Sequence, residues 1–384
     1  MRPYRSDSVR IGAVPKLGEQ IMRFRLTVLL SLAVLLPTSR ADGSAAPAPG
    51  RSVVTHDRAV GEVEDGVYVI KHRDAPDTNP QGNTTVIIGD QSVLVVDSGY
   101  LPSSTREDIA QIRQWTGKPV RYLVNTHWHP DHIRGNPLYA ATFPGLAIIA
   151  HSTTPELEEA YDGPNLVRYR ARVTSLEESL KRGKGEDGKK LSKEERSAMT
   201  VELTGRRAVL DELAAYKAAF PNVTFRADMT IDLGNRVVEL RHLGRGHSSG
   251  DVVVYLPRER ILIAGDLVAS PVPYFFAGYP YEQIATLEAI AAMDPRVLVP
   301  GHGDVMLDET SLNRTIEVMK DVRDQVLREV RKRGSLSAKL EDVRKAVDTR
   351  SYAAEFAGTD KESLAFFRES MDGLVRLFFE QAPK

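Results

Sequence analysis

The chain has 384 residues, of which 42% are hydrophobic, so it is long enough to bury a sizeable core. Its 51 basic and 52 acidic residues nearly balance, which gives no reason to expect nucleic acid as the main partner. It contains no cysteine, which excludes disulfides, a lipid-bearing N-terminal cysteine and thiolate ligands to a metal.

The N-terminal segment has the layout of a secretory signal peptide. Two arginines precede an apolar run over residues 26–36, and the small residues Ser39 and Ala41 follow it. The apolar run is too short for a comfortable membrane span. We therefore expect residues 1–41 to hold a signal peptide that starts at Met22, and the mature protein to be periplasmic or secreted without a stable membrane span. A single N-terminal membrane anchor is the alternative.

The next part of the chain alternates between strands and helices. Residues 42–55 are rich in Ala, Pro and Gly, which predicts a flexible linker. Short β-branched runs at 67–70, 86–88 and 93–96 are bounded by turn residues and predict strands. Residues 103–117 begin with serine caps and end with glycine, which predicts a helix.

The pattern then changes twice. From about residue 153 to 220 it is charged and amphipathic, which predicts a helical insertion that could act as a lid or as the contact of a homodimer. Strands resume within 223–244, 251–266 and 297–304. Residues 311–384 carry apolar residues at helical spacing and predict a C-terminal helical extension.

Two segments resemble each other. Residues 84–99 and 251–266 both read as strand, polar turn and strand, followed by an acid beside glycine, with Asp97 and Asp266 at matching places. This similarity predicts two related sheet-forming halves that face each other. A chance likeness between two hairpins is the alternative.

The segment HWHPDH places four residues of metal-ligand type within six positions: His127, His129, Asp131 and His132. It follows an apolar β-run and precedes a helical pattern, so it lies on a loop where side chains can converge. Neutral imidazoles and carboxylates are good ligands for Zn²⁺ and related divalent ions. The segment therefore predicts a metal-binding loop.

Three further residues of this type follow later strands, each beside glycine or a small residue: His247, Asp266 and His302. Seven groups are too many for one tetrahedral site, and they fit two adjacent metal ions that share a carboxylate. For any one histidine alone, a hydrogen-bonded core position is the alternative.

The HWHPDH segment with the three downstream residues resembles the H-x-H-x-D-H signature of the metallo-β-lactamase superfamily, over roughly residues 60–310. The resemblance implies an α+β fold, a four-layer αββα sandwich over residues 56–310, with the site at one edge between the sheets. It also implies two zinc ions as cofactors, with other divalent metals possible. By position, His127, His129 and His247 would hold the first ion, Asp131, His132 and His302 the second, and Asp266 would bridge both.

The resemblance further implies a mechanism. Two cations would lower the pKa of a shared water, so that a metal-bridged hydroxide, oriented by Asp131, attacks a small substrate of carbonyl type. Asp97 would support the site from behind its ligands. Esters, lactones, thioesters and amides, β-lactams included, remain open as substrates. The presence of Asp266 indicates a ligand set like that of glyoxalase II and disfavours a dedicated β-lactamase.

A Pro/Gly-rich loop after Asp266 carries four aromatic residues that could form an apolar wall of the substrate pocket: Tyr274, Phe275, Phe276 and Tyr279. Aromatic packing beneath the loop is the alternative. Two other functions stay open for the whole chain. One is a single-iron oxidoreductase resembling persulfide dioxygenases, and the other is a non-catalytic metal-binding protein. The remaining histidines have no assigned role, although His151 ends a strand and could support the site.

Overall fold

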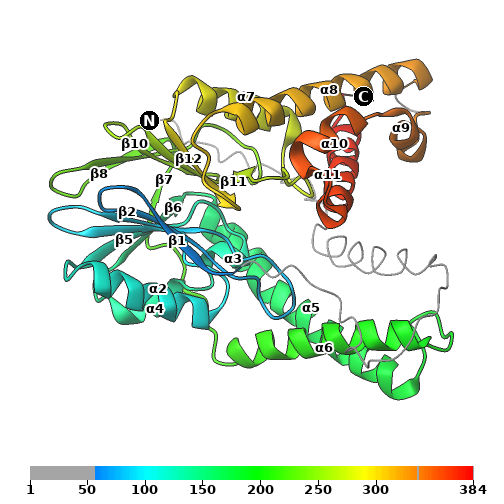
Figure 1. Ribbon diagram of the computed structural model, residues 1–384, viewed down its shortest axis with the longest axis horizontal. Coiled ribbons are helices and arrows are strands. Elements are labelled where there is room, and N and C mark those ends of the chain that lie inside the picture. Colours follow the sequence, from blue (N-terminus) through cyan, green and yellow to red (C-terminus); the bar gives the residue numbers. More distant parts are fainter. Residues whose placement is uncertain (1–56, 335–336, 384) are drawn as a thin grey trace, which may run out of the picture. The chain divides into compact units, whose positions relative to one another are not determined.

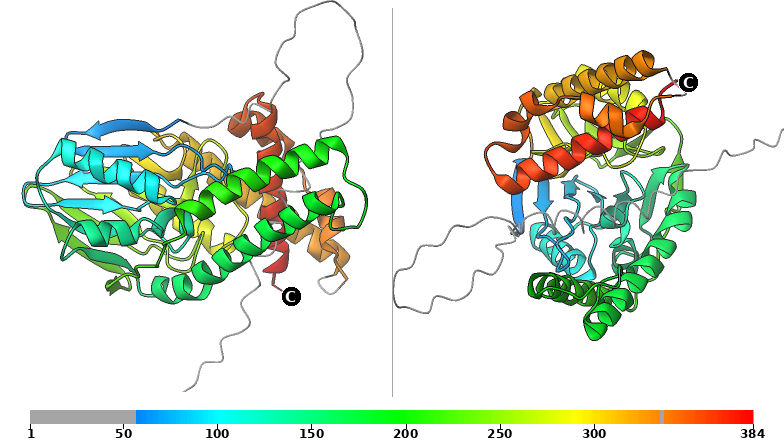
Figure 2. Two further views of the ribbon diagram at one scale, coloured as in Figure 1. Left: turned by 90° about the horizontal axis from the view of Figure 1, so that it is seen from below. Right: turned by 90° about the vertical axis from the view of Figure 1, so that its right-hand side faces the viewer.

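Two β-sheets lie face to face, and helices cover their outer faces (Figures 1 and 2). The computed structural model describes residues 57–334 and 337–383. The predicted signal peptide, the predicted linker and His56 lie outside the described residues. No helix within the described ranges is both long and apolar enough to cross a membrane.

The first sheet has seven strands in sequence order. The chain runs antiparallel from β1 to β4, and β4 to β7 are parallel neighbours. The strands predicted at 67–70, 86–88 and 93–96 are confirmed, whereas β1 was not predicted from the sequence. The strand bounds are β1 Ala59–Glu64, β2 Val67–Lys71, β3 Thr84–Ile88, β4 Val93–Val96, β5 Val120–Val124, β6 Ala147–His151 and β7 Val223–Phe225.

The second sheet has five strands in the order β12-β11-β10-β9-β8. Its first four strands along the chain are antiparallel, and β12 pairs parallel with β11. The hairpin β10–β11 therefore resembles the hairpin β3–β4, because each ends beside a parallel neighbour. The bounds are β8 Asp228–Asp232, β9 Val237–Arg241, β10 Val253–Leu256, β11 Ile261–Ala269 and β12 Val297–His302.

Alternation of side chains along the strands builds three apolar layers from these two sheets. In β4, Leu94 and Val96 enter the core between the sheets, whereas Val93 and Val95 enter the core under the outer helices. Residues 261–264 of β11 alternate in the same way between the inner core and the opposite outer core. The predicted four-layer αββα sandwich is thereby confirmed.

Helices on the two outer faces come from different parts of the chain. The apolar cluster on the outer face of the seven-stranded sheet includes residues of α2 and α4, and that of the five-stranded sheet includes residues of α7, α8 and α11 (Figure 1). The bounds are α2 Pro102–Trp115, α3 Pro130–Ile133, α4 Asn136–Thr142, α5 Thr154–Arg182, α6 Lys193–Glu212, α7 Pro280–Ala292, α8 Thr310–Arg333, α9 Leu340–Ala346, α10 Arg350–Ala357 and α11 Lys361–Glu380.

The helical insertion consists of α5 and α6, which pack against each other around a small apolar cluster of their own that includes Tyr100 and Leu101. Residues 183–192 separate the two helices, and the helical part ends at Glu212 rather than near residue 220. The C-terminal helices differ from the insertion, because α8 and α11 share the large apolar cluster of the five-stranded sheet.

Candidate metal centre

The seven predicted side chains meet at one edge of the sandwich. Asp266 lies within β11, His302 ends β12, and His247 lies in the loop between β9 and β10. His127 follows β5, and the short helix α3 begins at Pro130, which places Asp131 and His132 in its single turn. Ligand-type atoms form two groups, in each of which all atoms lie within 4.8 Å of one another. The groups are His127, His129, His247 and Asp266, and Asp131, His132, Asp266 and His302.

The first group gathers around one oxygen of Asp266. Its Oδ2 lies 3.7 Å from Nε2 of His127 and 3.5 Å from Nε2 of His247. The Nδ1 atom of His129 lies 2.9 Å from Nε2 of His247. Three imidazole nitrogens and one carboxylate oxygen therefore face a common point.

The second group gathers around the other oxygen of Asp266. Its Oδ1 lies 3.1 Å from Nε2 of His132 and 3.4 Å from Nε2 of His302. Asp131 completes the group, because its Oδ2 lies 3.1 Å from Nε2 of His302 and 3.4 Å from Nε2 of His132. Asp266 is thus the only residue common to the two groups among the described residues.

This arrangement fits two divalent cations. A tetrahedral zinc ion with ligands at about 2.1 Å separates those ligands by about 3.4 Å, close to the spacings between the side chains here. In addition, Nε2 of His127 and Oδ1 of Asp266 are buried and have no hydrogen-bond partner within the described part of the chain. Buried polar atoms without a partner are costly. A bound cation would satisfy both atoms.

The histidines of the first group are suited to binding a cation because they are neutral. Burial, reinforced by neighbouring imidazoles, holds the pKa of His127 well below its usual range. Burial likewise lowers the pKa of His129 to about 3 and lowers the pKa of His247. Each ring therefore keeps a lone pair available to a metal at neutral pH.

The second group is balanced by opposite charges instead. Burial opposes ionisation of its members, but the carboxylates of Asp266 and Asp131 raise the pKa of His132 well above its usual value and that of His302 to about 10. Against the same burial, the imidazoles hold the pKa of Asp131 and Asp266 well below the usual range. Both carboxylates are therefore ionised at neutral pH.

Asp97 fixes the orientation of His132. Its Oδ2 lies 2.8 Å from Nδ1 of His132, and its Oδ1 accepts a hydrogen bond of 2.8 Å from the backbone N–H of Thr126. Asp97 itself has a φ of 58°, so the chain turns sharply after β4 and aims the carboxylate toward α3. The Nε2 atom of His132 is thereby directed toward Asp266 and His302.

Two glycines allow the groups to pack this closely. A Cβ atom at Gly82 would lie 2.5 Å from the ring of His132, and one at Gly301 would lie 2.0 Å from Oδ1 of Asp266. Gly301 stands next to the predicted ligand His302 in the sequence. Nothing in the local sequence distinguishes Gly82, since its role depends on a contact with a residue 50 positions away.

A buried carboxylate that was not predicted from the sequence holds the loop of His247. Asp251 accepts hydrogen bonds from the backbone N–H of Ser248 at 2.9 Å and from its hydroxyl at 2.6 Å. Burial raises the pKa of Asp251 to about 7. Ser248 thus ties Asp251 to the bend that contains His247.

A buried ion pair joins the metal-binding loop to the helical insertion. The Nε and Nη2 atoms of Arg134 donate to Oδ1 of Asp162 on α5 at 2.9 and 2.8 Å. The guanidinium lies over the rings of Tyr100 and Tyr216, at 5.1 and 5.6 Å from their centroids. The insertion is therefore in direct contact with residues next to the second group.

The other described histidines have hydrogen-bonding partners outside the two groups. The buried ring of His72 lies between Asp108 and the carbonyl of Gly82, at 2.7 Å from each. His151 lies 3.0 Å from the carbonyl of Arg226 and stacks on the ring of His242. These rings take structural roles in the sheet and its loops.

The predicted aromatic wall divides into two kinds of residue. The ring of Tyr274 lies 6.1 Å from that of His247, and Phe276 packs against Tyr274 at 4.5 Å. The prediction for Phe275 was wrong, because its side chain is only 2% exposed and lies in the core of the five-stranded sheet. Adjacent side chains of an extended segment point to opposite sides. Tyr279 lies beneath the guanidinium of Arg245 instead.

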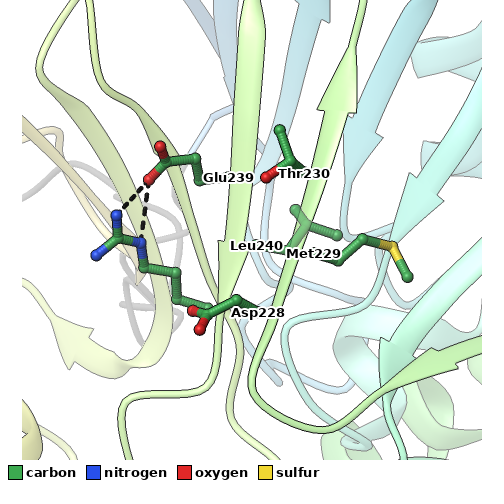
Figure 3. A pocket seen from close by; sticks show the side chains of 6 residues that line it. Asp228, Met229, Thr230, Glu239 and Leu240 are labelled. Atoms are coloured by element: carbon green, nitrogen blue, oxygen red, sulfur yellow. Dashed lines mark hydrogen bonds and ion pairs between the residues drawn. The ribbon is translucent and has the colours of Figure 1, made fainter.

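A shallow pocket on the five-stranded sheet holds none of the predicted site residues. It is lined by residues of β8 and β9, and Figure 3 shows these side chains on the two neighbouring strands. Arg241, one of the lining residues, is held by Glu239 through an ion pair. None of the metal-ligand residues lies on β8 or β9.

Comparison with known proteins identifies related sequences and structures. The family model described as the metallo-beta-lactamase superfamily matches residues 77–302. A linear primary-alkylsulfatase from a Pseudomonas species is 23% identical over 71% of this chain, and the match spans only 52% of that protein. A metallo-beta-lactamase type 2 from Bacillus cereus is 26% identical over 62% of this chain and 73% of that protein. A solved metallo-beta-lactamase from Pontibacter korlensis matches 69% of this chain and 99% of its own, with 19% identity and a TM-score of 0.49.

Proposed function

Because the chain belongs to the metallo-beta-lactamase superfamily, whose family model covers more than half of it, we propose that it is a hydrolase that uses two zinc ions. The observation that carries this proposal is the position of Asp266, whose two oxygens each face a different group of imidazoles. A carboxylate placed in this way suits a bridge between two cations. Superfamily members are mostly metallo-hydrolases, which supports hydrolysis at this coarse level.

The ligand assignment follows the two groups. His127, His129 and His247 would hold one ion, Asp131, His132 and His302 the other, and Asp266 would bind both. Bound zinc would supply acidification of a water molecule and polarisation of the bond to be cleaved. Asp131 is an ionised carboxylate whose side chain is 25% exposed, so it can accept a hydrogen bond from the attacking water and orient it. Asp97 keeps the second group in place through His132.

Substrates of ester type fit this chemistry, and the relatives suggest two subclasses. One relative is named as an alkylsulfatase and another as a beta-lactamase. The first name implies cleavage of a sulfate ester, and the second implies cleavage of an amide. We favour carboxylic and sulfate esters of small molecules. The chain's lack of cysteine separates it from lactamases that use a cysteine ligand.

Metal analysis combined with an activity screen tests the proposal. We expect two zinc ions per purified chain and hydrolysis of at least one substrate in a panel of carboxylic esters, thioesters, lactones, primary alkyl sulfates and β-lactams. Asp131→Ala should reduce that activity while the fold is kept. A single iron per chain with uptake of oxygen would instead establish a single-iron oxidoreductase. If the native protein bound metal but hydrolysed nothing in the panel, so that Asp131→Ala had no activity to lose, a binding protein would be favoured.

We further propose that the chain is exported. The basic and apolar segment before residue 42 supports a signal peptide, and the small residue Ala41 suits the cleavage site. Mass spectrometry of the protein recovered after expression in a bacterium should give an N-terminus at Asp42. Recovery of uncleaved chain in the cytoplasm would contradict export.

A further inference from the structure

Aromatic rings flank the first group of ligands on both sides. The ring of Trp128 lies 4.3 Å from that of His129, and the ring of Tyr274 lies 6.1 Å from that of His247. The two imidazoles are themselves neighbours, with centroids 4.7 Å apart. A continuous series of rings therefore runs through the metal centre.

The series extends further at both ends. On one side Tyr161 of α5 packs 4.8 Å from Trp128. On the other side Phe276 lies 4.5 Å from Tyr274, and Phe366 of α11 lies 6.2 and 6.0 Å from these two rings. All five rings are only half-buried, in contrast to the core residue Phe275. We call these five residues the aromatic row: Trp128, Tyr161, Tyr274, Phe276 and Phe366.

Helix α11 holds the loop between β11 and α7 that carries Tyr274 and Phe276. The hydroxyl of Ser370 donates to the carbonyl of Pro273 at 2.6 Å, and Arg376 donates to the carbonyl of Phe276 at 2.7 Å. Both bonds go to backbone carbonyls of the loop. The loop therefore owes its position to the C-terminal helix.

Close packing adds to these hydrogen bonds. A Cβ atom at Gly373 would lie 2.2 Å from the carbonyl oxygen of Phe275, so glycine is required where α11 crosses the loop. Gln381, the residue that caps the C-terminus of α11, donates to the carbonyl of Gly278 at 2.9 Å. Four contacts along α11 thus follow the loop from residue 273 to residue 278.

We infer that the aromatic row binds an apolar acyl or alkyl chain of the substrate, and that α11 is part of this binding site. The three uncharged rings on the side of His247 offer an apolar surface, which matches an extended chain better than a compact charged group. A chain lying along them would end at the metal centre, where Trp128 and Tyr161 stand on the opposite side of the ligands. The inference rests on the proposed function, since it names the substrate class of that same site.

Binding can be measured without hydrolysis through tryptophan fluorescence. The chain has two tryptophans, and Trp115 stacks on Tyr68 against the outer face of the seven-stranded sheet. Trp115→Phe therefore leaves Trp128 as the reporter. We would titrate this zinc-loaded protein with butanoate and octanoate. Both ligands would contact the metal through the same carboxylate. The ratio of their dissociation constants therefore reports the contribution of the apolar alkyl chain alone. Each fully buried methylene is worth about fourfold, so we expect octanoate to bind at least about tenfold more tightly.

Two substitutions on the same helix locate the site. In the Trp115→Phe background, Phe366→Ala should weaken octanoate binding about fivefold to tenfold and change butanoate binding less than about twofold. The control is Phe379→Ala, which removes another half-buried phenylalanine of α11 and should leave both affinities unchanged. Phe366→Leu keeps apolar volume and should retain most of the affinity. Comparison of the melting temperatures of the leucine and alanine variants shows whether the loss of binding in Phe366→Ala reflects unfolding.

The outcomes separate this inference from the proposed function. Equal affinity for butanoate and octanoate would overturn the aromatic row as a chain-binding site, even if esters are hydrolysed. Equal losses in Phe366→Ala and Phe379→Ala would also overturn it. A clear preference for octanoate that depends on Phe366 would support the inference, whether or not the panel of esters is hydrolysed.

Discussion

The metal centre and the aromatic row differ in how their positions are determined. The metal-ligand groups lie at strand ends and are fixed by buried charges, with Asp97 and Asp266 at less than 7% exposure. The aromatic row is half-buried, and apart from Trp128 in the metal-binding loop it is carried by the loop after β11, the insertion and α11. The contrast suggests that the sandwich provides the chemistry, while the segments added to it provide selectivity.

The strongest challenge to this contrast is removal of the bridging carboxylate. We expect Asp266→Asn to lower activity about a thousandfold, because the neutral amide cannot balance two cations. Zinc content should fall from two ions to one or fewer. Steady-state kinetics with the best substrate of the panel, together with elemental analysis, measures both effects. In this variant octanoate would bind to the aromatic row only through its alkyl chain. Retention of full activity would refute the bridging role of Asp266.

Loss of the carboxylate behind His132 should have a smaller effect. Asp97→Asn keeps the shape of the side chain but removes the charge that orients Nδ1 of His132. We expect metal affinity at the second group to fall about tenfold to a hundredfold. Competition with a chelator measures this affinity. Unchanged affinity for both zinc ions would show that backbone packing alone orients the ring.

The contact between α11 and the aromatic loop gives the next largest effect. Gly373→Ala places a methyl group against the carbonyl of Phe275 and should destabilise the chain by about 1 to 3 kcal/mol. Selectivity for octanoate over butanoate should fall, while zinc content stays at two. The matched control is Gly117→Ala in the loop after α2, where the added Cβ has no neighbour within 4 Å beyond the adjacent residues and the backbone is not left-handed. That control should be neutral or slightly stabilising, as thermal unfolding would show.

The smallest effect on function concerns Glu158 on α5, close to Asp162 of the ion pair that joins the metal-binding loop to the insertion. Burial, together with nearby Asp162, raises the pKa of Glu158 to about 8. Because the folded pKa lies above the unfolded one, the contribution of this group to stability is complete below about pH 4.5. It is then lost as the pH rises toward 8. Glu158→Gln should therefore lessen the fall in stability between pH 5 and 8 by about 1 to 3 kcal/mol.

Urea unfolding at several pH values measures this difference. Parallel pH profiles for the native chain and the variant would contradict the burial of an ionisable Glu158. Zinc content and octanoate binding should be the same in both proteins, since Glu158 belongs neither to the metal-ligand groups nor to the aromatic row.

The sequence was informative where function depends on local spacing. His127 to His132 lie within six positions, and β-branched runs bounded by turn residues predicted strands that belong to both sheets. Gly82 and Gly373 could not be predicted, because each is required by a contact with a residue 50 or more positions away. Phe275 was assigned to the pocket because composition cannot tell which side of an irregular loop faces the core. Phe366 carried no signal beyond helical spacing, so its place beside Tyr274 emerged only from the fold.

The central claim is that two zinc ions lie on either side of Asp266. Anomalous X-ray diffraction at the zinc absorption edge, on crystals of the zinc-loaded protein, tests it most directly. We predict two peaks, one among His127, His129 and His247 and the other among Asp131, His132 and His302, with one oxygen of Asp266 on each. A single peak, or peaks bound by residues outside these groups, would contradict the account.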